Sequence, residues 1–251
     1  MKRAFLKFFE HIGAAAILFW RSILAFREIL KVLRASLWVQ IDIMATGSLP
    51  LIILTAVFSG LVTTVQIAYY GRGYAPMDYI GAAVAKMVMI ELGPVLTALI
   101  VAGRVGAGIA AEIGTMKVTE QIDALECMGI DPVRFLVLPR ILAGIIVLPA
   151  LTVIADFTAI FASSIAANLN VGVSFYVYFH GVRLFFLPWD FWGGLIKAAV
   201  FGWIITFVGA HWGLQSERGA TGVGRSTTNS VVTSSLLILI SDYFLTILIY
   251  Q

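Results

Sequence analysis

The sequence predicts an all-α integral membrane protein with five transmembrane helices, and three observations support this class. Hydrophobic residues make up 60% of the 251 residues, and only 12% are charged, whereas soluble domains carry about a quarter. The mean hydropathy is +0.97. The apolar residues are gathered into five stretches of about 20 residues or more, the length that crosses the hydrocarbon core of a bilayer.

Residues 1–41 are predicted to form a basic amphipathic helix that lies in the membrane interface. Seven Lys and Arg residues alternate here with apolar side chains, and the longest uncharged run, residues 12–20, is too short to span a bilayer. A signal peptide is the alternative, with residues 14–20 as its apolar region. No small-residue cleavage site follows Trp20, which favours the interfacial helix.

The five apolar stretches are predicted to be membrane spans joined by polar or aromatic connections. The predicted spans are residues 49–70, 87–111, 141–167, 193–214 and 231–250. Residues 168–190 are rich in aromatic side chains, which indicates a piece lying at the interface. Residues 215–230 are polar, and the glycine-rich part, 219–224, is predicted to be a flexible loop.

The charged segment 112–132, between the second and third spans, predicts a short cytoplasmic helix of about two to three turns. Thr119 is placed to cap its start, Gly129 suits the left-handed position after its end, and Pro132 prevents continuation. One face is apolar and the neighbouring face is acidic. The apolar residues are Ile122, Leu125 and Met128, and the acidic residues are Glu120, Asp123 and Glu126.

Such a short helix is marginal in water on its own, so we expect the spans to brace it and a partner to cover it. An ordinary amphipathic loop helix is the alternative. The single cysteine, Cys127, lies in this helix, where we expect it to be a small apolar filler. One cysteine allows no intramolecular disulfide.

Five charged residues fall inside the predicted spans, where each costs at least about 2.5 kcal/mol at the bilayer centre. These residues are Glu91, Arg104, Asp156, Lys197 and Asp242. They can pair and hold the bundle together, line a transport path, or extend from the span ends to the interface. Lys197 and Asp242 lie in adjacent spans at depths that differ by about 6 Å, at a rise of about 1.5 Å per residue. An ion pair between these two residues is therefore predicted.

The distribution of Lys and Arg predicts the orientation of the spans. Twelve of them fall in the N-terminal segment and in the loops 112–140 and 215–230, whereas the other side has Arg72 and Arg183, with Lys86 at a span boundary. The positive-inside rule places the N-terminus and the charged helix in the cytoplasm, and Gln251 outside.

Several classes of function have no support in the sequence. A P-loop pattern for ATP, a nucleophile elbow and an H-E-x-x-H motif are all absent. His11, His180 and His211 have no metal-ligand spacing, and no basic run interleaved with aromatics points to nucleic acid. We therefore expect a non-catalytic protein with no cofactor, no metal and no nucleic-acid partner.

Five short motifs follow one another in a stretch of about 40 residues, and their order is more specific than any one of them. They are Glu91-Leu92-Gly93-Pro94, Ala102-Gly103-Arg104, Ala111-Glu112-Ile113-Gly114, Thr119-Glu120-Gln121 and Asp131-Pro132. In these motifs the chain resembles the MlaE family of permeases, the membrane subunits of lipid-transporting ABC systems. One departure is Ile90, where some relatives carry an arginine, so a charge pair at that point is in doubt.

The resemblance implies a multi-pass permease of a bacterial inner membrane that moves glycerophospholipid between the inner and outer membranes. It implies a homodimer, a cytoplasmic ABC ATPase bound to each copy, a periplasmic MCE-domain protein, and often a small STAS-domain protein. Closure of the ATPases would push segment 112–132 and rock the spans around a lipid cavity. We expect coupling through Glu112, Lys117 and the two faces of the short helix, and lipid contact at Thr64, Gln66, Tyr69, Tyr70 and Glu91.

Two other classes of protein remain open at this point. An ion-coupled secondary transporter or channel would use Glu91, Asp156 and Asp242, although no internal repeat of the kind common in such folds is visible. An intramembrane enzyme would need a paired catalytic group, and the sequence offers no recognisable one. Co-purification with an ATPase would separate the permease from both.

Overall fold

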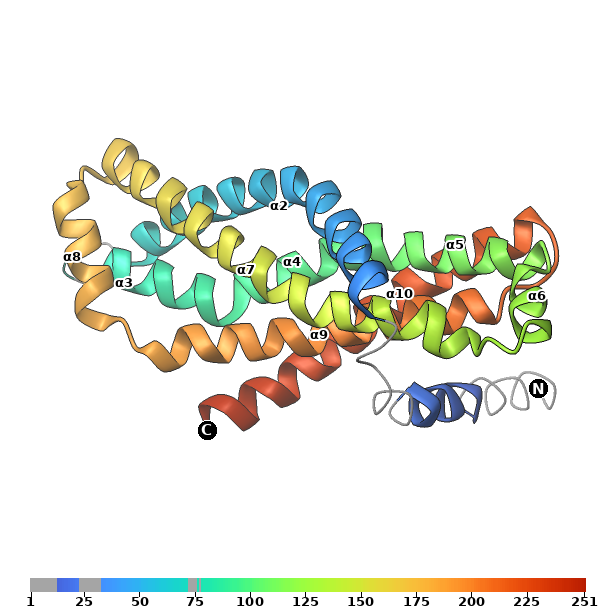
Figure 1. Cartoon of the computed structure of the whole chain (residues 1–251). Helices are drawn as coiled ribbons and strands as arrows, with labels where there is room; N and C mark the ends of the chain where they lie inside the picture. Colours follow the sequence, from blue (N-terminus) through green and yellow to red (C-terminus); the bar gives the residue numbers. More distant parts are fainter. Residues whose placement is uncertain (1–12, 23–32, 72–75, 77) are drawn as a thin grey trace, which may run out of the picture. The chain divides into compact units, whose positions relative to one another are not determined.

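The computed structural model describes residues 13–22, 33–71, 76 and 78–251, and the regular elements of this part of the chain are all helical (Figure 1). Five helical stretches are long and apolar enough to cross a membrane, which confirms the predicted fold class. They are Ser36–Gly71, Tyr79–Val118, Val133–Val171, Pro188–Leu214 and Ala220–Tyr250.

Two of these stretches are assembled from several shorter helical elements. The second contains α3 (Asp78–Met87), η2 (Val88–Leu92), α4 (Gly93–Val101), η3 (Ala102–Gly106) and α5 (Ala107–Val118). The third contains η4 (Val133–Val137), α7 (Leu138–Ala166) and η5 (Ala167–Val171). The elements named η are single π-turns. The remaining elements are α2 (Leu33–Gly71), α6 (Gln121–Cys127), α8 (Phe175–Phe185), α9 (Pro188–Leu214) and α10 (Ala220–Tyr250).

Three helices extend further than the sequence predicted. Residues 33–41 belong to α2 and continue into the first span, so the interfacial helix does not reach Ile41 as predicted. Most of the rest of that prediction falls on residues 1–12 and 23–32, which lie outside the described residues. The predicted flexible loop at 219–224 is wrong, because α10 begins at Ala220, and α5 continues past Glu112 to Val118. Adding turns to an existing helix avoids the cost of nucleation, which explains why polar residues join the long helices.

The chain divides into two compact units, and each long helix contributes to both. Unit 1 contains Met1–Met44, Val101–Ile145 and Gly202–Leu237. Unit 2 contains Ala45–Ile100, Ile146–Phe201 and Ile238–Gln251. We describe each unit by itself.

Unit 2 is held together by close backbone contacts at glycines. A side chain at Gly60 of α2 would overlap the carbonyl of Ala159 in α7, and the Thr64 hydroxyl donates to the Ser163 carbonyl at 3.3 Å. The helices α3 and α8 lie side by side (Figure 1), with Gly81 against the Tyr178 carbonyl. Small residues that allow helix backbones to approach are the usual means of packing in membranes.

Unit 1 is also packed through glycines and hydroxyl groups. The Ser230 hydroxyl donates to the carbonyl of Gly106 at 3.1 Å, and a side chain at Gly202 of α9 would overlap the Gly144 carbonyl of α7. The hydroxyls of Ser216 and Ser226 are 2.8 Å apart and join the two sides of the α9–α10 turn. These hydroxyl groups find partners within the bundle, as most buried polar groups do.

Candidate functional site

The motif Glu91–Pro94 lies inside the second span, at the π-turn η2. The Gly93 N–H donates to the Val88 carbonyl, five residues back. Pro94 has no N–H, so the Ile90 carbonyl loses the donor that an α-helix would supply from the fourth residue on. The ammonium Nζ of Lys197, from α9, takes that place at 3.2 Å from the Ile90 oxygen. Pro94 therefore leaves the Ile90 carbonyl without its α-helical donor, and Lys197 of the fourth span donates to it instead.

Lys197 is fully buried and binds two carboxylates. Its Nζ lies 2.6 Å from Glu91 Oε2 and 2.9 Å from Asp242 Oδ1. The predicted ion pair of Lys197 with Asp242 is thus confirmed, and Glu91 is a third member that the sequence analysis did not include. The three residues, here called the charge cluster, come from the second, fourth and fifth spans. Each charge has an opposite partner, which a low-dielectric location requires.

The end of α10 is fastened to the start of α9 beside the charge cluster. The Tyr250 hydroxyl donates to the Asp190 carbonyl at 3.2 Å, and Trp189 Nε1 donates to the Ile249 carbonyl at 3.0 Å. The Tyr250 ring centre is 5.9 Å from the Lys197 ammonium, which adds a cation–π contact. Asp190 also pairs with Lys86 of α3 at 3.4 Å.

Asp156, in α7, is buried, and it forms no ion pair with the part of the chain that the structure describes. Its Oδ1 has no hydrogen-bond partner among the described residues and lies against the Cα of Gly93. Any side chain at position 93 would overlap this oxygen, so the glycine of the motif makes the space that Asp156 occupies. Glu91–Pro94 therefore contacts the fourth and fifth spans through the charge cluster and the third span through Asp156.

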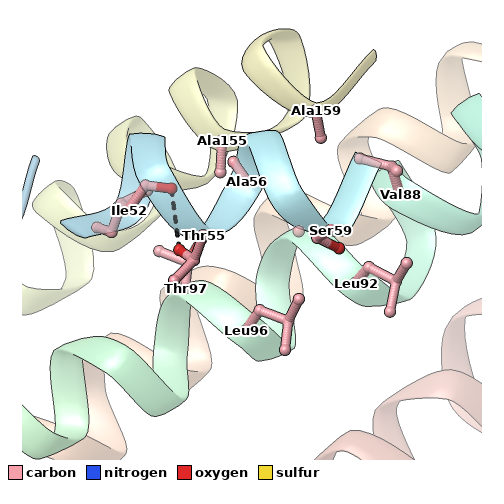
Figure 2. A pocket seen from close by; sticks show the side chains of 11 residues that line it. Ile52, Thr55, Ala56, Ser59, Val88, Leu92, Leu96, Thr97, Ala155 and Ala159 are labelled. Atoms are coloured by element: carbon pink, nitrogen blue, oxygen red, sulfur yellow. Dashed lines mark hydrogen bonds between the residues drawn. The ribbon is translucent and has the colours of Figure 1, made fainter. Parts of the chain in front are cut away.

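A small crevice lies beside Gly93, between α2, the η2–α4 segment and α7 (Figure 2). Figure 2 shows Thr55 and Ser59 from α2 facing Thr97 and Leu96, with the Thr55 hydroxyl bonded to the Ile52 carbonyl at 3.0 Å. Its volume is about 10 Å³, room for about one water molecule. This crevice is far too small for a lipid.

The residues predicted to touch lipid divide into two groups. Thr64 is fully buried, and its hydroxyl bonds to the Gly60 and Ser163 carbonyls, so it faces α7. Gln66, Tyr69 and Tyr70 point away from unit 2, with Tyr69 and Tyr70 exposed by 69% and 76%. Glu91 is partly exposed, but its carboxylate binds Lys197.

The short helix of segment 112–132 is α6, and its start differs from the prediction. Thr119 ends α5 and its hydroxyl donates to the Thr115 carbonyl, whereas the residue before α6 is Glu120, with φ of 60°. Thr119 is therefore not the N-cap, because α5 extends to Val118 and occupies that turn. Gly129 has φ of 74°, which confirms the predicted left-handed end. Cys127 is exposed, so it is not a buried filler.

The apolar face of α6 is shared between the protein and its surroundings. Ile122 is 7% exposed and packs inside unit 1, Leu125 is half-buried, and Met128 is 66% exposed. The acidic residues Glu120, Asp123 and Glu126 are all exposed. The exposed surface of α6 and its end therefore consists of the apolar Met128 and an acidic face.

Two contacts brace the chain on either side of α6. Arg140 is 3% exposed, pairs with Glu112 of α5 at 2.8 Å and donates to the Leu136 carbonyl at 2.7 Å. The Lys117 ammonium donates to the Leu214 carbonyl at the end of α9. These contacts connect α5, α7 and α9 close to the two ends of α6. Arg104 lies on η3 at an exposed position.

Comparison with known proteins decides the family. The family model of permease MlaE matches residues 37–248. The chain belongs to the MlaE permease family. A probable ABC transporter permease protein of Rickettsia prowazekii is 41% identical over 249 residues, which cover 98% of this chain and 95% of the relative.

Relatives of the MlaE permease also occur in photosynthetic organisms. A probable ABC transporter permease protein of Synechocystis is 41% identical over 212 residues, 84% of this chain and 81% of the relative. The chloroplast protein trigalactosyldiacylglycerol 1 of Arabidopsis thaliana is 34% identical over 241 residues, 92% of this chain and 69% of the relative. The protein is therefore a multi-pass membrane permease subunit of the ABC transporter kind, a class of subunit that is generally non-catalytic.

Proposed function

We propose that this MlaE permease moves glycerophospholipid between the inner and outer membranes of a bacterium and thereby maintains the lipid asymmetry of the outer membrane. The main support for this proposal is that the chain belongs to the MlaE permease family. A relative at 34% identity is named after a glycerolipid, which supports a lipid as the transported molecule. ATP hydrolysis belongs to a separate cytoplasmic ATPase that the permease binds.

The braced α6 helix supports coupling to that ATPase. Met128 and Leu125 enter a groove of the ATPase, and Glu120, Asp123 and Glu126 face its surface. Because Glu112–Arg140 and Lys117–Leu214 connect the ends of segment 112–132 to three spans, closure of the ATPase moves those spans. A helix whose apolar tip fills a groove is a common mode of recognition.

A second copy of the chain supplies the rest of the lipid cavity. The crevice beside Gly93 has room for about one water molecule, so unit 2 does not enclose a lipid by itself. Gln66, Tyr69 and Tyr70 are exposed near one end of α2 and line the cavity between two copies. A periplasmic MCE-domain protein receives or delivers the lipid there, and a STAS-domain protein binds on the cytoplasmic side.

The ion-coupled transporter is less favoured than the permease. It would require Glu91, Asp156 and Asp242 to carry an ion, and two of these three carboxylates hold Lys197.

The proposed substrate is tested by identifying what the protein carries. The complex is purified with its ATPase in a mild detergent, and bound lipid is extracted and identified by mass spectrometry. We expect glycerophospholipid at a ratio above that of a matched complex carrying Tyr69→Ala and Tyr70→Ala. Equal amounts of lipid in both complexes would show that Tyr69 and Tyr70 do not contribute to lipid binding. Failure of any ATPase to co-purify would contradict the proposed coupling to an ATPase.

The orientation of the chain is tested by reporter fusion. Twelve Lys and Arg residues against two predict a cytoplasmic N-terminus and a periplasmic C-terminus. Alkaline phosphatase fused after Gln251 is expected to be active, and the same enzyme fused within the polar segment 215–219 is expected to be inactive. An inactive fusion at Gln251 would mean that the chain crosses the membrane an even number of times.

A further inference from the structure

The exposed face of α8 carries two neighbouring rows of side chains that the transport function proposed above does not use. Phe175 and Phe179 lie four residues apart and are exposed, and they form the apolar row. The exposed residues Tyr176, His180 and Arg183 are spaced by four and three residues, and they form the polar row. Each row runs along the helix, so the face is divided lengthwise into an apolar and a polar half.

The opposite face of α8 is buried and fixes the orientation of both rows. Tyr178 and Gly181 are the buried residues of this helix. The Tyr178 hydroxyl is hydrogen-bonded to the Ser163 hydroxyl of α7, and its carbonyl lies against Gly81 of α3. Because α8 is attached to two other helices of unit 2 on this side, the two rows face outward as a rigid surface.

α8 lies where the third span ends and the fourth begins. Figure 1 shows α8 running across the ends of α7 and α9, to which it is connected by residues 172–174 after η5 and by residues 186–187. Trp189 and Trp192, at the start of α9, are both exposed, and Trp is enriched where a membrane meets water. These features place α8 at the level of lipid headgroups. The third span separates α8 from α6 along the chain, so α8 belongs to the opposite surface of the membrane.

The polar row is rich in hydrogen-bond donors. The rings of Tyr176 and His180 are stacked with their centres 6.0 Å apart, which holds the hydroxyl and the imidazole side by side. Arg183 follows His180 by three residues, and its guanidinium presents N–H donors in a planar fork that matches phosphate oxygens. The row can therefore bind an anion through several donors at once.

The acidic residues around α8 leave the charge of Arg183 uncompensated. The helix itself contains no acidic residue. Asp190, the next acidic residue along the chain, is buried and already pairs with Lys86 at 3.4 Å. Asp78 begins α3, but Arg183 forms no ion pair with any residue that the structure describes. Its guanidinium is therefore available to an anion from outside the protein.

We propose that α8 binds the headgroup of an anionic phospholipid in the leaflet away from α6. The polar row contacts the phosphodiester, and the apolar row lies among the first methylenes of the acyl chains. This order matches the change from headgroup to hydrocarbon along which an interfacial amphipathic helix lies. An acidic protein surface would pair with Arg183 but would leave Phe175 and Phe179 in water, whereas a lipid accommodates both rows. All of these residues lie on α8, so the site is separate from the lipid contacts proposed on α2.

The test is photo-crosslinking of the full-length permease in nanodiscs of phosphatidylcholine. Trace amounts of phosphatidylglycerol or of phosphatidylcholine are added, each with the same diazirine on the first carbons of one acyl chain, and labelled residues are located by mass spectrometry. At Phe175 and Phe179 we expect about fivefold more label from the phosphatidylglycerol probe, the size expected for one basic residue at an anionic surface. Leu248 is exposed near the end of α10 that is bonded to the start of α9, and it should be labelled equally by the two probes.

Matched arginine variants show whether the polar row produces this preference. Arg183→Gln should abolish the preference for phosphatidylglycerol, and Arg183→Lys, which keeps the charge, should retain most of it. Arg218→Gln, at an exposed arginine just before α10, should leave the preference unchanged. Arg183 is itself exposed, so these variants are expected to fold as the wild type does.

Three results would overturn the proposal. The first is equal labelling of Phe175 and Phe179 by the two probes in the wild type, and the second is a preference that survives Arg183→Gln. The third is absence of label from both phenylalanines with either probe, which would leave the polar row to an acidic protein partner. The readout is bound lipid, so a failure of transport does not affect the result.

Discussion

Replacing Lys197 with methionine is expected to lower the free energy of unfolding by about 3–5 kcal/mol, because the change leaves the buried Asp242 and the partly exposed Glu91 without their cation. Lys197 is fully buried and contacts Glu91 and Asp242 at 2.6 and 2.9 Å. The Ile90 carbonyl, which Pro94 already deprives of one backbone donor, loses the hydrogen bond from Lys197 as well. The measurement is the thermal midpoint of the purified complex in detergent or nanodiscs.

Compensating variants show which carboxylate, Asp242 or Glu91, accounts for the loss of stability in Lys197→Met. Lys197→Met with Asp242→Leu should recover part of the lost stability, and the further change Glu91→Gln should recover most of it, since no buried charge then remains unpaired. Asp242→Asn alone should cost less than Lys197→Met, because Glu91 still pairs with the lysine. If each single variant were as stable as wild type but failed to transport lipid, the charge cluster would belong to the transport path and not to the scaffold.

Arginine at Met128 or at Leu125 is expected to abolish binding of the ATPase without preventing membrane insertion. Met128 is the most exposed apolar residue of the α6 segment, and Leu125 lies beside it, half-buried. A charged side chain in an apolar groove costs several kcal/mol, which is enough to dissociate a complex of ordinary affinity. The measurement is the amount of ATPase that co-purifies with the tagged permease.

Two further variants serve as controls for this result. Met128→Leu keeps an apolar side chain and should retain the ATPase. Ile122→Arg should destabilise the permease itself, because Ile122 packs inside unit 1, and is therefore not a test of the interface. Normal recovery of the ATPase with both Met128→Arg and Leu125→Arg would show that α6 lies outside the contact.

The sequence predicted the fold class and one feature of the site from simple physical quantities. Composition and the length of the apolar runs predict five spans, and the rise per residue predicts the pair of Lys197 with Asp242. Glu91 was missed because that estimate treated neighbouring spans only. Pro94 could have indicated it. Because Pro94 has no N–H, the Ile90 carbonyl beside Glu91 lacks a backbone donor, and a side-chain donor such as Lys197 is then expected close to Glu91.

The local errors have a common physical origin. Thr119 was predicted to cap α6 and the glycines at 219–224 to form a loop, and both predictions relied on intrinsic preferences of single residues. Helices that are already long continue through such residues, because each added turn gains hydrogen bonds without a new nucleus. Thr64 is buried because its face of α2 packs against α7. The sequence did not predict which face packs, because apolar residues lie on both faces of this span.

The bond between Lys197 and Glu91 also constrains the order of events during synthesis. It joins residues 106 positions apart, so the second helix enters the membrane with a carboxylate whose partner has not yet been made. Asp242 follows later still, in the last helix. The final arrangement of unit 2 is therefore completed only after the fourth and fifth helices arrive, and a ribosome stalled before Lys197 would leave an intermediate in which the Glu91 carboxylate still lacks this ammonium partner.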